Sequence, residues 1–203
     1  YNPDSQLRAN AETSLAETLR QPGALLALVN LVGSQSGSHR DLRQAAGIVL
    51  KNNVRKYWSE DGESEVRIPC TLEEKQATKE AITAVMLKET DNSIRGIVAE
   101  VIKNIAINDY PEKWPTLLPA LLEGAAQSSN VLCLYNSLFT LRKLAKRYEF
   151  KAKGERQALD EIVIKSFPLL QTLTTQLVDN KTPEAADIMK VCLKIFNSCT
   201  QYQ

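Results

Sequence analysis

The sequence predicts an all-α protein, an α-solenoid of HEAT-type helical hairpins, and three observations lead to this fold class. Leu, Ala, Glu, Lys and Gln dominate the composition, and aromatic residues make up only 6% of the 203 residues, which favours helix. Apolar residues recur with a period of 3.6 along the chain, without the alternation of half-buried strands. Hairpins would start at irregular steps of about 36 to 52 residues, whereas HEAT-type repeats span about 40–47.

Nine amphipathic segments justify the helices in order. Gln21-Pro22-Gly23 separates the first two, and Thr71 with Glu74 forms a capping box before the fourth. Pro168 is expected to kink the eighth, and Thr182 and Pro183 begin the ninth as N-cap and first helical residue. The segments cover residues 7–19, 25–32, 42–57, 72–86, 94–105, 114–122, 134–148, 159–177 and 183–195.

Pairing neighbours through their short connections gives four hairpins and an unpaired ninth helix, about four and a half repeats of a superhelical array. A hairpin of this kind buries its apolar face only against a neighbour. We therefore interpret residues 1–203 as a segment of a longer solenoid. An internal echo supports duplication, because Arg43 lies eight residues before Lys51-Asn52 and Arg95 lies eight before Lys103-Asn104.

Composition excludes several function classes. The 25 Lys and Arg nearly cancel the 24 Asp and Glu, which argues against general affinity for nucleic acid or an anionic membrane. No apolar run approaches the roughly 20 residues of a membrane span. The four cysteines form no CxxC pair and His39 is the single histidine, so a zinc site is not expected. Cys192 and Cys199 are interpreted as core residues, and unpaired cysteines suit the cytosol or nucleus.

No catalytic or cofactor motif is present, because Walker, GxGxxG and GxSxG sequences are all absent. His39, in a Gly/Ser-rich stretch, is interpreted as plain surface. Trp58 and Trp114 are expected to fill hairpin junctions, with stacking on a cofactor or peptide as the alternative. The sequence therefore indicates a binding protein.

Two charged runs leave alternatives open. The acidic run is interpreted as a solvated insertion or as a contact for a basic partner. The basic run is interpreted as cations near the negative end of a helix dipole, or as a site for an acidic ligand or phosphate. The acidic run comprises Glu60, Asp61, Glu63 and Glu65, and the basic run comprises Arg142, Lys143, Lys146, Arg147, Lys151, Lys153 and Arg156.

Polar residues on the second helices of the hairpins are the candidate contacts. In curved solenoids one layer of helices lines the concave surface, which is the usual binding face. Helix phase alone assigns the candidates to it. They are Asn30, Glu73, Gln76, Lys79, Glu80, Thr83 and Glu123.

Three motifs resemble the importin-β (karyopherin-β) family of nuclear transport receptors. Residues 43–52, followed by Trp58, match the family's Arg-Gln-x-Ala, Leu-Lys-Asn and Trp signature, and residues 109–118 resemble its Tyr/Phe-Pro-x-x-Trp-Pro segment. Residues 144–156 are similar to the importin seven/importin eight branch. The motif residues are expected to be structural; they are Arg43, Gln44, Ala46, Leu50, Lys51, Asn52, Trp58, Pro111, Trp114 and Pro115.

The resemblance implies the N-terminal portion of a non-enzymatic receptor without cofactors, with the signature region at about 7–88 and further HEAT repeats at about 91–203. It also implies binding of Ran-GTP through inner helices of the first repeats, which controls cargo loading and release in nuclear import. Import cargo and FG nucleoporins would bind mostly elsewhere in a receptor that shuttles between cytoplasm and nucleus. The alternatives are an export receptor, a HEAT-repeat scaffold for another complex, and, more weakly, an enzyme or a nucleic-acid binder using residues 142–156.

Overall fold

The computed structural model describes residues 5–34, 39–59, 70–127, 129–151, 154 and 156–201, and these residues form helices joined by turns, without a strand. The predicted all-α class is therefore confirmed. The helices of the described residues are α1 (Ser5–Thr18), α2 (Ala24–Gly33), α3 (Arg40–Tyr57), α4 (Leu72–Lys88), α5 (Asn92–Asp109), α6 (Leu117–Ala126), α7 (Val131–Lys146), α8 (Gln157–Leu177) and α9 (Pro183–Thr200).

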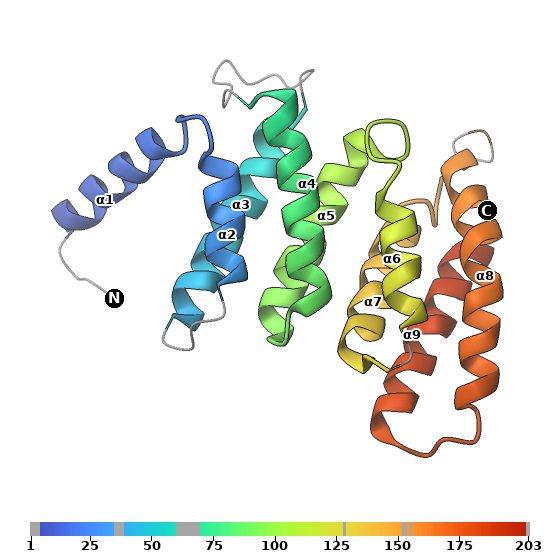
Figure 1. Ribbon diagram of the computed structural model, residues 1–203. Helices are drawn as coiled ribbons and strands as arrows, with labels where there is room; N and C mark the ends of the chain where they lie inside the picture. Colours follow the sequence, from blue (N-terminus) through green and yellow to red (C-terminus); the bar gives the residue numbers. More distant parts are fainter. Residues whose placement is uncertain are drawn as a thin grey trace.

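Eight of these helices lie in two layers that extend in one direction (Figure 1). We call α2, α4, α6 and α8 the even layer and α3, α5, α7 and α9 the odd layer. Within the odd layer α3 packs on α5, α5 on α7 and α7 on α9, and between layers α2 packs on α3 and α6 on α7. This one-dimensional stacking is the arrangement of an α-solenoid.

The ninth helix is not unpaired, which corrects the sequence interpretation. α9 packs against both α7 and α8. Its buried side includes Ile188 and Ile195 together with Cys192 and Cys199, so the prediction that both cysteines are core residues is confirmed.

The predicted pairing is shifted by one helix. The consecutive helices that pack closely are α2 with α3, α4 with α5, α6 with α7 and α8 with α9. The predicted hairpins of α3 with α4, α5 with α6 and α7 with α8 are therefore wrong as well, because a short connection does not show which neighbour a helix packs against.

The first helix was expected to pair with α2, and this expectation is wrong. No residue of α1 is buried, and Leu7 and Leu15 are 54% and 42% exposed. Figure 1 shows α1 extending away from the layers, beyond a turn in which Gly23 has a φ of 84°. Its apolar residues recur every four positions, so they drift about 40° per step around a 3.6-residue helix and form no broad stripe.

A continuous hydrophobic core runs between the layers from Leu25 to Cys199. Trp58 and Trp114 belong to it, at 3% and 2% exposure, so the core-packing interpretation of both tryptophans is confirmed. Among the described residues no helix combines the length and apolar character needed to cross a membrane.

Helix termini mostly follow the predicted signals. Thr71 Oγ1 accepts from the Glu74 N–H, and Thr182 Oγ1 accepts from the Ala185 N–H with Pro183 as first helical residue. α6 differs, because it begins at Leu117 rather than Trp114. The preceding residues form turns instead, with the Trp114 N–H donating to the Pro111 carbonyl and the Leu117 N–H to the Trp114 carbonyl.

A pair of Leu→Ala variants tests the structural role of the signature residue Leu50. Leu50 is fully buried and Leu72 is 76% exposed. Leu50→Ala should lower the free energy of unfolding by about 2–5 kcal/mol, because it removes buried methyl groups and leaves a cavity. Leu72→Ala should change it by less than about 0.5 kcal/mol. Urea denaturation followed by circular dichroism measures both, and equal effects would contradict the packing described.

Candidate functional site

The even layer carries five of the seven candidate contacts on its surface. Gln76 and Glu80 lie one turn apart on α4, where Gln76 Nε2 donates to Glu80 Oε1 at 2.8 Å. Because this bond holds two exposed polar groups side by side, α4 presents a small preformed surface to solvent. The exposed candidates are Asn30 on α2, Glu73, Gln76 and Glu80 on α4, and Glu123 on α6.

The other two candidates, Lys79 and Thr83, are buried at 5% and 9% exposure. Lys79 Nζ lies 2.6 Å from Asp109 Oδ2 and donates to the Lys113 carbonyl at 2.7 Å. Thr83 Oγ1 donates to the Lys79 carbonyl at 2.8 Å. Helix phase predicted that both side chains face a partner, and this is wrong. Their polar atoms bind other groups inside the protein.

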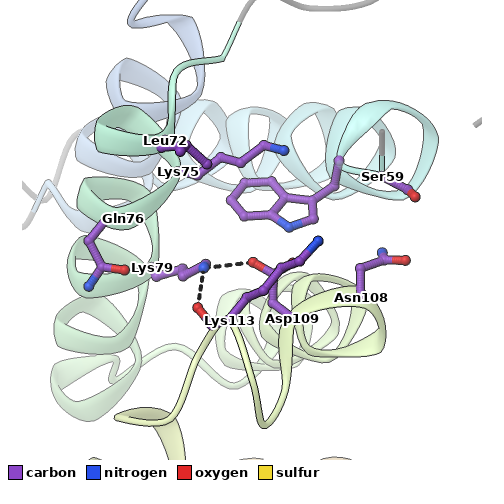
Figure 2. A pocket seen from close by; sticks show the side chains of 9 residues that line it. Ser59, Leu72, Lys75, Gln76, Lys79, Asn108, Asp109 and Lys113 are labelled. Atoms are coloured by element: carbon purple, nitrogen blue, oxygen red, sulfur yellow. Dashed lines mark hydrogen bonds and ion pairs between the residues drawn. The ribbon is translucent and has the colours of Figure 1, made fainter. Parts of the chain in front are cut away.

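A cleft of about 570 Å³ lies where the end of α3, the beginning of α4 and the turn after α5 meet; we call it the rim cleft. Figure 2 shows the Lys79 ammonium between the Asp109 carboxylate and the Lys113 carbonyl at this cleft. Lys79 also lies 6.0 Å from the Trp114 ring centroid. The residues that line the rim cleft are Trp58, Ser59, Leu72, Lys75, Gln76, Lys79, Asn108, Asp109 and Lys113.

A buried ion pair joins the signature residue Arg43 to Glu89, a residue that the sequence did not single out. The Glu89 side chain is fully buried, and Arg43 is 8% exposed. Arg43 Nε also donates to the Val32 carbonyl at 2.8 Å, and Glu89 Oε1 accepts from the Asp91 N–H at 2.8 Å. Every charge is thereby paired or hydrogen-bonded, as burial requires.

The carbonyl of Glu89 is a second junction. Asn136 Nδ2 on α7 donates to it and to the Met86 carbonyl, each at 2.9 Å, and Arg95 Nη2 on α5 donates to it at 3.3 Å. Arg43 and Arg95 therefore both bind a carbonyl at the end of an even-layer helix, which agrees with the duplication inferred from sequence. Asn136 could have been identified, because it interrupts the apolar face of its helix.

Asp91 caps α5 and joins it to α3. Its carboxylate accepts from the Ser93 and Ile94 N–H groups, and Arg40 Nε lies 2.7 Å from Oδ2. The Ile94 N–H and the Arg40 side chain hold the pKa of Asp91 below its ordinary value, against a smaller opposing effect of burial. The carboxylate is therefore the form that the fold stabilises.

Part of the basic run is engaged structurally. Lys143 Nζ lies 2.6 Å from Glu100 Oε1 on α5. Arg147 donates to the Ala106 and Ile107 carbonyls near the end of α5, each at 2.7 Å, and Arg156 donates to the Gln201 carbonyl after α9. Arg147 and Arg156 therefore bind carbonyls at the ends of neighbouring helices, whereas Lys143 pairs with an acid in the middle of α5. Lys143 and Arg147 lie at the end of α7, and Arg156 is the N-cap residue of α8. The acidic run at 60–65 lies outside the described residues.

The motif residues divide by burial. The buried members are Arg43, Ala46, Leu50, Trp58 and Trp114, and their expected structural role agrees with their contacts. Gln44, Lys51 and Pro111 are half-buried, and Asn52 and Pro115 are exposed, so burial supports no such role for these two. Across the described part of the chain no group of three His, Cys, Asp or Glu side chains could hold a metal ion.

Comparison with known proteins gives consistent matches. Residues 11–105 match the family model described as importin-beta N-terminal domain, and residues 91–202 match the one described as exportin 1-like protein. The chain is 31% identical to an importin beta-like SAD2 homolog of Arabidopsis thaliana and 32% identical to Importin-8 of Danio rerio. Each alignment covers 98% of this chain and 19% of the relative.

Export proteins also match. Exportin-2 of Dictyostelium discoideum is 24% identical over 164 residues. The solved structure of the exportin Cse1 in its cargo-free, cytoplasmic state superposes with a TM-score of 0.84 at 20% identity, over 98% of this chain and 22% of that chain. This structural likeness supports the solenoid fold.

Replacing Glu89 tests the buried ion pair. Glu89→Gln keeps the size of the side chain but leaves Arg43 buried without a countercharge, so it should cost about 3–5 kcal/mol of unfolding free energy. Glu80→Gln on the same helix is exposed and should cost less than about 0.5 kcal/mol. Chemical denaturation of both variants measures the costs, and a Glu89 variant as stable as the control would refute the role assigned to the pair.

A pH series tests Asp91. Its lowered pKa in the folded protein contributes stability that is present above the unfolded value of about 3.9 and is lost as pH falls towards the folded value. Asp91→Asn keeps an N-cap acceptor but cannot ionise, so its deficit relative to the unmodified protein should shrink between pH 6 and pH 3. Urea denaturation at each pH measures the deficit, with Asp187→Asn as an exposed control. A constant deficit would exclude this linkage.

Proposed function

Since the chain belongs to the importin-β family of nuclear transport receptors, we propose that it binds Ran-GTP through the even layer and thereby controls cargo loading and release in nuclear protein import. Members of this family are carriers rather than enzymes. The chain spans about a fifth of the length of the relatives it matches. Residues 1–203 would accordingly be an N-terminal segment of a longer HEAT-repeat receptor, with import cargo and FG nucleoporins bound mostly by other segments.

The observation that carries the proposal is the exposed polar surface of the even layer within the matched importin-beta N-terminal domain. Asn30 lies on α2, and Gln76 and Glu80 lie one turn apart on α4. All three side chains are exposed. α2 and α4 pack directly against each other. The exposed polar residues therefore lie on two helices that support each other, which limits the entropy lost when a partner binds.

Discrimination between nucleotide states requires contacts that differ between the two forms of the GTPase. The γ-phosphate orders the switch loops, and a surface complementary to the ordered form gains affinity for it. Shifting occupancy from 1:99 to 99:1 needs about 5.5 kcal/mol of differential binding. An extended layer can distribute this difference over several exposed side chains, so no single residue has to dominate.

Export is the second candidate, and the match of residues 91–202 to the exportin 1-like family supports it. The two Importin-8 and importin-beta-like relatives, at 32% and 31% identity, favour import over the 24% identity to Exportin-2. Either direction requires shuttling between cytoplasm and nucleus. Import and export are distinguished by whether binding of the GTPase weakens or strengthens the binding of cargo. This coupling can be measured from either ligand, because each changes the affinity of the other by the same factor.

Binding to Ran loaded with GTP or with GDP tests the proposal. The protein should bind the GTP form more tightly. Gln76→Ala combined with Glu80→Lys should weaken that binding about tenfold, since it removes the polar pair and reverses one charge. Asp187→Lys, a charge reversal on the exposed side of α9, is the control and should leave binding unchanged. Surface plasmon resonance measures the affinities.

Two outcomes would contradict the proposal. Equal affinity for the two nucleotide forms, or no binding of either, would exclude a Ran receptor when measured on the full-length receptor that contains this segment. Equal weakening by the α4 double variant and the α9 control would exclude the even-layer surface as the contact.

A further inference from the structure

We propose that an apolar groove between α8 and α9 is the docking surface for the next helical hairpin of a longer receptor. The groove, which we call the terminal groove, has a volume of about 310 Å³. α8 contributes Phe167 and Leu170 to its lining, and α9 contributes Cys192, Leu193 and Phe196. The inference extends the proposal that the chain is part of a longer solenoid, and it does not depend on Ran binding.

Exposed apolar side chains gather at the terminal groove. Phe167 and Phe196 meet across it, with ring centroids 5.5 Å apart. Phe196 is 52% exposed and Leu193 is 60% exposed. Ile164, about one turn before Phe167 on α8, is 74% exposed. Single exposed apolar residues are ordinary on a protein surface, whereas a contiguous group of them marks an interaction site.

The interior helices of the odd layer show how a helix looks when it is covered on both sides. α5 lies between α3 and α7, and α7 lies between α5 and α9. The exposed residues of α5 and α7 all lie within three positions of a helix end. α9 differs, because Ala186, Leu193 and Phe196 are exposed on an arc of about 80° around the helix. α9 therefore has an apolar side that a second odd-layer neighbour would cover.

The position of the groove and the length of the relatives identify the occupant. α8 and α9 lie at the end of the array opposite α1 (Figure 1). A solenoid ends in a repeat with a polar outer face, which α8 and α9 do not provide. The chain covers 19% of the two relatives and 22% of the exportin structure, and residues 11–105 match a domain described as N-terminal. A hairpin after α9 would therefore cover α8 and α9 as these helices cover α6 and α7.

Thiol accessibility tests the proposal on two proteins, the full-length receptor that contains this segment and the 203-residue chain alone. Leu193→Cys places a thiol in the terminal groove, and Asp187→Cys places the control thiol about 120° away around α9. N-ethylmaleimide should modify Leu193→Cys about tenfold more slowly in the full-length receptor, because reaction requires an accessible thiol. It should modify Asp187→Cys equally fast in both proteins. Mass spectrometry of the peptide that carries each new thiol measures the rates, and circular dichroism checks the fold.

Three results would overturn the proposal. Equally fast modification of Leu193→Cys in both proteins would show that the groove stays open in the receptor. Slow modification in the 203-residue chain alone would show that no further hairpin is needed to close it, and a rate that falls as protein concentration rises would assign the closure to a second copy. Equal slowing of Leu193→Cys and Asp187→Cys in the receptor would indicate general shielding of α9. None of these measurements involves the GTPase, so they are independent of the test of Ran binding.

Discussion

The buried carboxylate of Glu89 is the constraint on which the stacking of these helices depends. A fully buried acid is tolerated only when its charge is paired and its lone pairs are filled, and here Arg43 and the Asp91 N–H supply both. Arg43 simultaneously binds the Val32 carbonyl at the end of α2. One side-chain pair therefore links α2, α3 and the end of α4.

The same solution recurs along the array. Arg95 and Asn136 bind the Glu89 carbonyl, and Arg147 binds the carbonyls that end α5. These contacts bind backbone carbonyls at the ends of α4 and α5 and link those ends to neighbouring helices. The layers are thus joined by directional polar contacts as well as by the nonspecific core. Together these contacts hold the exposed face of α4 and the rim cleft in a defined position.

Periodicity and terminus signals were sufficient to locate the helices, because both depend on residues close in sequence. Thr71 and Thr182 cap the helices as predicted, and Trp58 and Trp114 are buried as predicted. Exposure was less predictable. Gln76 and Glu80 face solvent, whereas Lys79 on the same helix is buried. Its partner Asp109 is distant in sequence, and no local pattern could reveal that pair.

The sequence by itself determined the all-α class, the number and order of the helices, and the family, since helix formation and the spacing of motif residues are local properties. Only the tertiary structure decided which helices pack together, that α9 is packed while α1 is not, and that Glu89 and Asn136 are structural centres. The rim cleft also belongs to this second group. It combines residues from three helices and a turn, and contacts between such distant segments arise only when the chain is folded.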